Sequence, residues 1–152
     1  MAPDYDIRLT GPDDVAALAV LRAHWAAELH GPSPDEGFPA AFAAWHHEET
    51  NRRRWWLAVG PTRPIGMVSL ALFDRMPAPG RPQSRWGYLA NMFVVPERRD
   101  HGVGAALLAE LLQWSHRQRL ARVVLSPSQR SIPFYLRHGF HPAEELLIMT
   151  LA

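Results

Sequence analysis

Apolar and polar residues alternate along parts of this chain and recur at helical spacing along others. The alternation over residues 6–10 predicts a short first strand, and two apolar stretches around the turn at residues 60–64 predict an antiparallel hairpin. A longer apolar run predicts a central strand that ends at Pro96. The expected strands after the first cover residues 55–59, 65–73, 86–95 and 122–125, with one or two final strands from residue 140 onward that include residues 146–151.

Helical spacing predicts four helices between these strands. The first helix follows Thr10, which we expect to cap it, and it ends at the proline-rich residues 31–34. Its expected apolar face consists of Val15, Leu18, Leu21, Trp25 and Leu29. The other helices are expected at about residues 39–51, 105–115 and 129–138, with Gly139 ending the last. Strands alternating with helices indicate an α/β (α+β) fold.

Composition narrows the class of protein. The chain has 152 residues, 47% of them apolar and 20% charged, which predicts one globular domain over residues 1–152. A net charge of +1 argues against a nucleic-acid partner. The chain has no cysteine, no apolar run of membrane-spanning length and no signal pattern at residues 1–10, so we expect a cytoplasmic protein with no membrane partner.

The hexapeptide at residues 99–104 lies between the central strand and the third helix. Its glycines, Gly102 and Gly104, let the backbone bend and let a ligand approach without meeting a Cβ atom. The first N–H groups of the following helix have no partners and lie at the positive end of the helix dipole, which suits a phosphate or pyrophosphate. Two glycines after a strand are often only a loop, so this motif needs the support of a second.

The second motif spans residues 128–140. Arg99, Gly102 and Gly104 in the first motif, with Tyr135, Gly139 and Phe140 in the second, resemble the signature of the Gcn5-related N-acetyltransferase superfamily in order and spacing. The order of predicted elements over almost the whole chain fits the same superfamily. Two positions depart from its pattern: Ser128 stands where asparagine is usual, and Ser131 where alanine is usual.

The resemblance implies a single-domain acyl-CoA N-acyltransferase fold, a mixed sheet of about six to seven strands flanked by about four helices. It implies acetyl-CoA as cosubstrate and no metal, with the pantetheine arm on the backbone of Met92, Phe93 and Val94. It also implies Tyr135 as the general acid toward the departing thiolate, and a backbone N–H near Val94 for the oxyanion. The remaining cofactor contacts that it implies are Arg99, Asp100, His101, Gly102, Val103, Gly104, Ala105 and Ser128.

The acceptor side is less constrained. Asn91 precedes the point where the central strand is expected to diverge, and its amide could orient the acceptor or a water. The acceptor is a small-molecule amine or a peptide, and its pocket is expected among residues 30–38, residues 76–85 and Asn91. The general base stays open among Glu28, His24, His30 and ordered water. A homodimer is possible.

Each of these residues also has a structural interpretation. Tyr135 could cap the core, Asn91 could be a satisfied buried amide, and the tryptophans 25, 45, 55, 56 and 114 are expected in the core rather than in an aromatic ligand cage. Residues 52–54, all arginine, are expected at a solvated helix end. The histidine pairs at 46/47 and 138/141 are poorly spaced for a metal. The alternative function is a CoA-binding regulatory module that has lost turnover.

Overall fold

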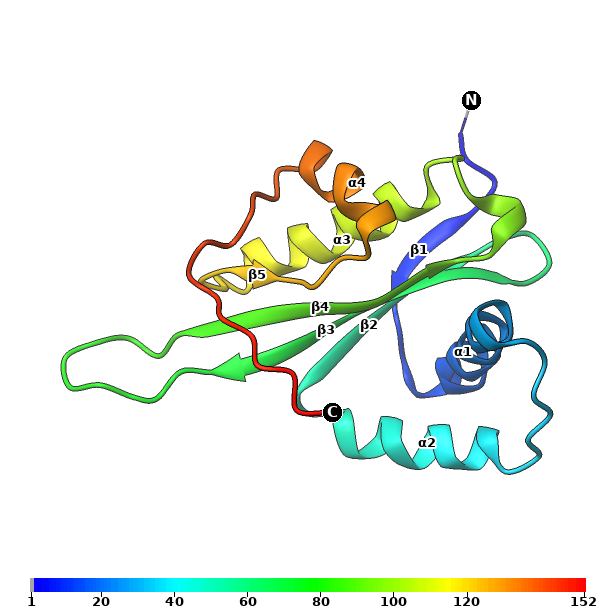
Figure 1. Cartoon of the computed structure of the whole chain (residues 1–152), viewed down its shortest axis with the longest axis horizontal. Coiled ribbons are helices and arrows are strands. Elements are labelled where there is room, and N and C mark those ends of the chain that lie inside the picture. The colour runs from blue at the N-terminus through cyan, green and yellow to red at the C-terminus, as the bar shows by residue number, and fades with distance from the viewer. Residues whose placement is uncertain (1) are drawn as a thin grey trace.

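The computed structural model describes residues 2–152, and its central feature is one five-stranded sheet between two layers of helices (Figure 1). The strands lie side by side in chain order. The first four pair antiparallel, and the fifth is parallel to the fourth. Their bounds are β1 Asp6–Leu9, β2 Arg53–Val59, β3 Pro64–Asp74, β4 Arg85–Val94 and β5 Val123–Val124.

Helices α1 (Val15–His30) and α2 (Phe38–Glu49) cover one face of the sheet, and α3 (Val103–Arg117) and α4 (Ile132–Arg137) cover the other (Figure 1). Single 3-10 turns precede α1, α3 and α4 over Pro12–Asp14, Pro96–Arg98 and Gln129–Ser131. Successive strand residues point to opposite faces. Thus Trp55 packs against Phe42 and Trp45 of α2, whereas its neighbour Trp56 packs against Trp114 of α3. Of the five tryptophans expected in the core, all but Trp45 belong to it or pack against it.

The predicted hairpin and the last helix end are confirmed. The turn between β2 and β3 is closed by a 2.9 Å hydrogen bond from the Gly60 N–H to the Arg63 carbonyl. Gly139 ends the α4 region with φ +93°, in the left-handed region that glycine adopts readily. The first helix begins differently from the prediction. The cap is Asp14, whose carboxylate accepts from the Gly11 N–H at 2.9 Å and pairs with Arg8.

The predicted strand at residues 146–151 is wrong for this structure, and with it the expectation of six to seven strands. No strand follows β5 among the described residues, and residues 141–152 are all exposed. The side chains of Leu147 and Ile148 are 100% and 93% exposed. A strand needs a neighbour to pair with, and none of the five strands of the sheet pairs with this segment. No helix among residues 2–152 is long and apolar enough to cross a membrane.

Candidate active site

Strands β4 and β5 diverge almost as soon as they meet. They pair only at Gly87–Val123 and Tyr88–Val124, so from Leu89 to Val94 the β5-facing edge of β4 has no strand beside it. Met92, Phe93 and Val94 lie on this open stretch. The predicted divergence of the central strand is therefore present, at the place where a ligand could pair with free backbone groups.

A β-bulge interrupts β4 in the same stretch. Ser69 stands opposite Ala90, but Met67 stands opposite Phe93, so Asn91 and Met92 together face the single residue Val68. Asn91 has φ +58°, a left-handed conformation that asparagine tolerates better than most residues. The bulge turns the strand locally and re-aims the Asn91 side chain.

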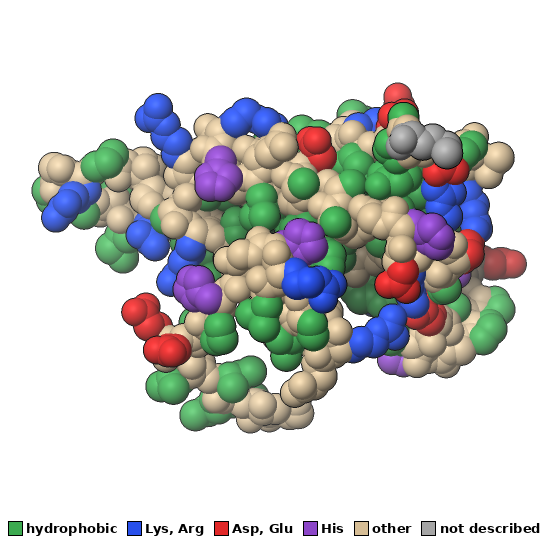
Figure 2. Space-filling view, turned by 90° about the horizontal axis from the view of Figure 1, so that it is seen from above, with side chains coloured by type: hydrophobic (Ala, Val, Ile, Leu, Met, Phe, Trp, Pro, Cys, Tyr) green, Lys and Arg blue, Asp and Glu red, His purple; other side chains and the backbone are tan. Residues whose placement is uncertain are grey.

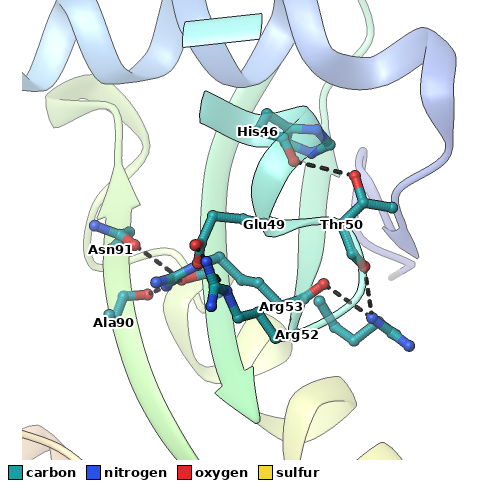
Figure 3. A network of polar contacts seen from close by, with 9 residues as sticks. His46, Glu49, Thr50, Arg52, Arg53, Ala90 and Asn91 are labelled. Carbon is teal, nitrogen blue, oxygen red and sulfur yellow. Dashed lines mark hydrogen bonds and ion pairs between the residues drawn. The ribbon is translucent and has the colours of Figure 1, made fainter. Parts of the chain in front are cut away.

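A polar network fixes that side chain (Figure 3). The hydroxyl of the fully buried Ser69 lies 2.8 Å from Asn91 Oδ1 and 3.2 Å from the Ala90 carbonyl, and it accepts from Arg53 Nη1 at 3.0 Å. Arg53 Nε in turn donates to Glu49 at 3.1 Å. Because Asn91 uses its carbonyl oxygen toward Ser69, its amide N–H groups remain for a ligand.

Sequence reasoning missed Ser69, Arg53 and Glu49. The expectation of a solvated arginine run is wrong for Arg53, whose side chain is only 16% exposed and is paired with Glu49. Burial disfavours the charge on Glu49, but Arg53 and Arg52 outweigh this effect and lower its pKa. A sequence signal did exist, because Ser69 is the only polar residue in the buried part of β3.

The glycine turn has the geometry that anion binding requires. Asp100 and Gly102 adopt φ values of +60° and +84°, and Gly102 caps α3. The first helical hydrogen bond runs from the Ala106 N–H to the Gly102 carbonyl at 3.0 Å. The N–H groups of residues 103–105 therefore have no acceptor within the helix and point out of its N-terminus. This cradle fits a pyrophosphate.

Arg99 ties this turn to its surroundings. Its Nε donates to the Val94 carbonyl at 2.9 Å, and its two terminal nitrogens donate to the two oxygens of the Glu28 carboxylate at 2.9 and 2.8 Å. The hydrogen bond from Arg99 lowers the pKa of Glu28. Glu28 is thus an ionised partner of an arginine, and its bond to Arg99 opposes the uptake of a proton that a general base must accept.

Tyr135 belongs to α4 and is buried. Its ring is 7% exposed and contacts Phe134 and Phe140 edge-on, so the core-capping interpretation describes the ring correctly. Its hydroxyl makes no hydrogen bond within residues 2–152. Burial raises the pKa of Tyr135, which keeps the phenol protonated and able to donate. Neighbouring Phe134 approaches the position of Gly104, which places α4 beside the start of α3.

Ser128 and Ser131, the two residues that depart from the superfamily pattern, contact each other. The Ser128 hydroxyl lies 3.0 Å from that of Ser131, and the Ser131 hydroxyl lies 3.0 Å from the Ser128 carbonyl. Together they close the 3-10 turn before α4. Both residues keep a local role that the sequence did not reveal.

A pocket of about 310 Å³ lies on the α1/α2 face, beside the bulge. Of the segments expected to frame it, residues 30–38 supply only Phe38 and residues 76–85 supply nothing, while Asn91 does line it. His24, Glu28 and His30 are not among its lining residues; His24 packs edge-on against Phe93 instead. The full lining is Arg22, Phe38, Ala41, Phe42, Trp45, Trp55, Met67 and Asn91.

Charged side chains of both signs are interspersed over the face shown in Figure 2. Of the histidines singled out in the sequence, His46 and His138 lie against aromatic rings. His46 stacks near Trp55, and burial together with neighbouring His47 lowers its pKa. Within residues 2–152, no three His, Asp or Glu side chains come together as a metal site would require.

Comparison with known proteins agrees with this geometry. Among solved structures, an acetyltransferase from Clostridium acetobutylicum described as "predicted acetyltransferase with acetyl-CoA" superposes with a TM-score of 0.76 at 21% identity, over 96% of both chains. An acetyltransferase from Trypanosoma brucei superposes with a TM-score of 0.74 at 23% identity, over 97% of this chain and all of the other.

Sequence comparison reaches the family itself. A "Glucosamine 6-phosphate N-acetyltransferase" from Trypanosoma brucei brucei is 30% identical over 89 residues, which span 59% of this chain and 58% of that enzyme. The family model for the acetyltransferase (GNAT) family matches residues 18–140. Since that match covers most of the chain, this protein belongs to the acetyltransferase (GNAT) family.

Proposed function

We propose that this chain transfers the acetyl group of acetyl-CoA to a primary amine, on a small molecule or a peptide. The observation that supports this most directly is the open edge of β4 after Tyr88, which leads to the unpartnered N–H groups at the start of α3. An extended, hydrogen-bonding arm that ends in a pyrophosphate matches both features, and coenzyme A has that form.

In this proposal the backbone of Met92, Phe93 and Val94 binds the pantetheine arm. The N–H groups of the turn residues from Asp100 to Ala105 hold the pyrophosphate, with the helix dipole favouring its charge. Arg99 keeps the turn in place through Val94 and Glu28. Ser128, whose hydroxyl already contacts Ser131, offers a further contact from its free lone pairs.

Holding both substrates at β4 makes the attack effectively intramolecular. The acceptor nitrogen bonds to the acyl carbon, and the bond from that carbon to sulfur breaks. A backbone N–H near Val94 stabilises the charge on the acyl oxygen. Tyr135 donates its phenolic proton to the sulfur, and its raised pKa keeps that proton in place beforehand.

The acceptor nitrogen must also lose a proton. None of the three residues considered as a base lines the pocket, and Glu28 is engaged by Arg99. We assign this proton to solvent that reaches the open pocket. Asn91, whose amide hydrogens face away from Ser69, orients the acceptor or the water.

A CoA-binding module without turnover is the second candidate. The mutual hydrogen bonding of Ser128 and Ser131, and the absence of a carboxylate or imidazole from the pocket lining, favour it. The two candidates differ in what the Tyr135 hydroxyl is for.

The test combines calorimetric titration with coenzyme A and a thiol-release assay with acetyl-CoA over a broad amine panel, for the native chain and Tyr135→Phe. We expect the substitution to lower kcat by about 100-fold or more, the usual contribution of a general acid. CoA affinity and thermal stability should stay unchanged, because the hydroxyl makes no hydrogen bond within residues 2–152. Tight CoA binding without thiol release from any amine would establish the binding module instead.

A further inference from the structure

The pocket beside Asn91 has walls of unusual composition. Four aromatic side chains line it, from Phe38, Phe42 and Trp45 of α2 and Trp55 of β2, together with Met67 and Ala41. Trp45 meets Trp55 edge-on at 6.1 Å, and Phe42 lies 5.7 Å from Trp45. Trp45 is 39% exposed, whereas Trp55 and Phe42 are buried. A largely apolar cleft is thus open to solvent on the Trp45 side.

Besides the indole N–H groups of Trp45 and Trp55, two polar side chains among residues 2–152 line this cleft. Asn91 presents its amide at the end next to the open edge of β4. Arg22 enters from α1 with its guanidinium 4.8 Å over the Trp25 ring, and within residues 2–152 it pairs with no carboxylate. A half-buried arginine without an acidic partner favours an anionic group on whatever fills the pocket.

We propose that the acceptor is a primary amine on a flat aromatic body with an anionic group, such as a carboxylate, that pairs with Arg22. The inference rests on the proposed acetyltransferase function. The ring lies against the aromatic walls, and the amine reaches the β4 edge beside Asn91. At about 310 Å³ the volume is at the small end of ligand pockets, which start at roughly 300 Å³, and it suits one or two fused rings.

A sugar acceptor fits these walls less well. Each hydroxyl taken out of water needs a hydrogen-bonding partner, and beyond the indole N–H groups of Trp45 and Trp55 the lining side chains among residues 2–152 offer only those of Arg22 and Asn91. The structure therefore favours an aromatic acceptor over an amino sugar.

The test measures thiol release from acetyl-CoA with tryptophan, tryptamine, glucosamine 6-phosphate and putrescine. We expect tryptophan to have the highest kcat/KM. We expect Trp45→Ala to raise the KM for tryptophan at least tenfold and Trp45→Phe to restore most of it. Trp86→Ala is the matched control, because Trp86 stacks on Phe73 outside the pocket. Arg22→Gln should raise the KM for tryptophan about tenfold, the cost of one charge-assisted hydrogen bond, and leave that for tryptamine unchanged.

The outcomes distinguish failure of the aromatic acceptor from failure of the proposed acetyltransferase function. Preference for glucosamine 6-phosphate or putrescine would overturn the aromatic acceptor and leave the acetyltransferase function standing. Equal KM values in Trp45→Ala and the native chain would also overturn it. Thiol release with none of these amines, nor with the broad panel, would remove the proposed function on which the inference rests.

Discussion

The bulge at Asn91 makes a sharp prediction about stability, because two substitutions there differ by a single Cβ atom. In an ordinary strand, alanine is more stable than glycine by roughly 0.5–1 kcal/mol. Asn91 has φ +58°, and a residue with a Cβ pays about 1–2 kcal/mol for that left-handed conformation. The order should therefore reverse, with Asn91→Gly more stable than Asn91→Ala by about 1 kcal/mol.

Both variants lose the same side-chain interaction. The Asn91 amide oxygen lies 2.8 Å from the Ser69 hydroxyl, and a hydrogen bond of this kind contributes about 0.5–1.5 kcal/mol. Because this loss is common to the two variants, it cancels in their difference. Loss of the amide should also lower the rate of acetyl transfer to the same extent in both.

Urea denaturation and thermal unfolding measure the difference. A gap of about 1 kcal/mol corresponds to about 2–4 °C in melting temperature for a domain of this size. Ala90→Gly is the control, since Ala90 precedes the bulge and pairs regularly with Ser69, and there glycine should destabilise. If Asn91→Ala is as stable as Asn91→Gly, the left-handed conformation at this position is wrong.

Three further predictions concern the turn, the network and pH. Gly102→Ala should lose about 1–2 kcal/mol of stability as well as CoA affinity, because φ at this residue is +84°. In Gly104→Ala the added Cβ meets only ordinary contacts with Phe134, so this variant should keep its stability. Calorimetric titration with coenzyme A and thermal unfolding compare the two variants. Ser69→Ala should cost about 1–3 kcal/mol in urea denaturation, since it removes the partner of Arg53 Nη1 and of the Asn91 amide oxygen. His46→Gln should flatten the pH dependence of stability. The lowered pKa of His46 means that the native state binds fewer protons than the unfolded state below about pH 6.5, so this contribution is present above that pH and is lost as the pH falls. Equal slopes between pH 5 and 7.5 in both proteins would contradict it.

The parts of the fold that the sequence predicted are those with local causes. The hairpin at residues 60–64, the glycine that ends α4 and the strand–turn–helix around Gly102 each depend on neighbouring residues, and each is confirmed. The failed prediction at residues 146–151 has a different origin. Its apolar pattern describes a strand correctly in composition, but a strand exists only with a partner, and local sequence does not say where that partner lies.

The candidate site likewise combines features that local sequence predicts with features that only the folded sheet determines. The free edge at residues 92–94 and the turn at residues 100–105 follow from motifs. The bulge does not, because it depends on the register of β4 against β3, which only the folded sheet sets. Trp55 illustrates a further limit: it was expected in the core and lies there, yet it also lines the pocket beside Asn91.

The bulge also separates the two halves of the proposed reaction in space. The edge of β4 that faces β5 is where the pantetheine arm is proposed to bind, whereas the pocket of Trp45, Trp55 and Arg22 lies on the α1/α2 face of the same strand. The two regions adjoin at the bulge, where Asn91 lines the pocket and Met92 begins the stretch proposed for the arm. Substitutions in the pocket should therefore change the KM of the acceptor without changing CoA affinity, and substitutions in the Gly102 turn should do the opposite. A chain built this way can alter its acceptor by changes on α2 alone, while the cosubstrate site on β4 and α3 stays intact.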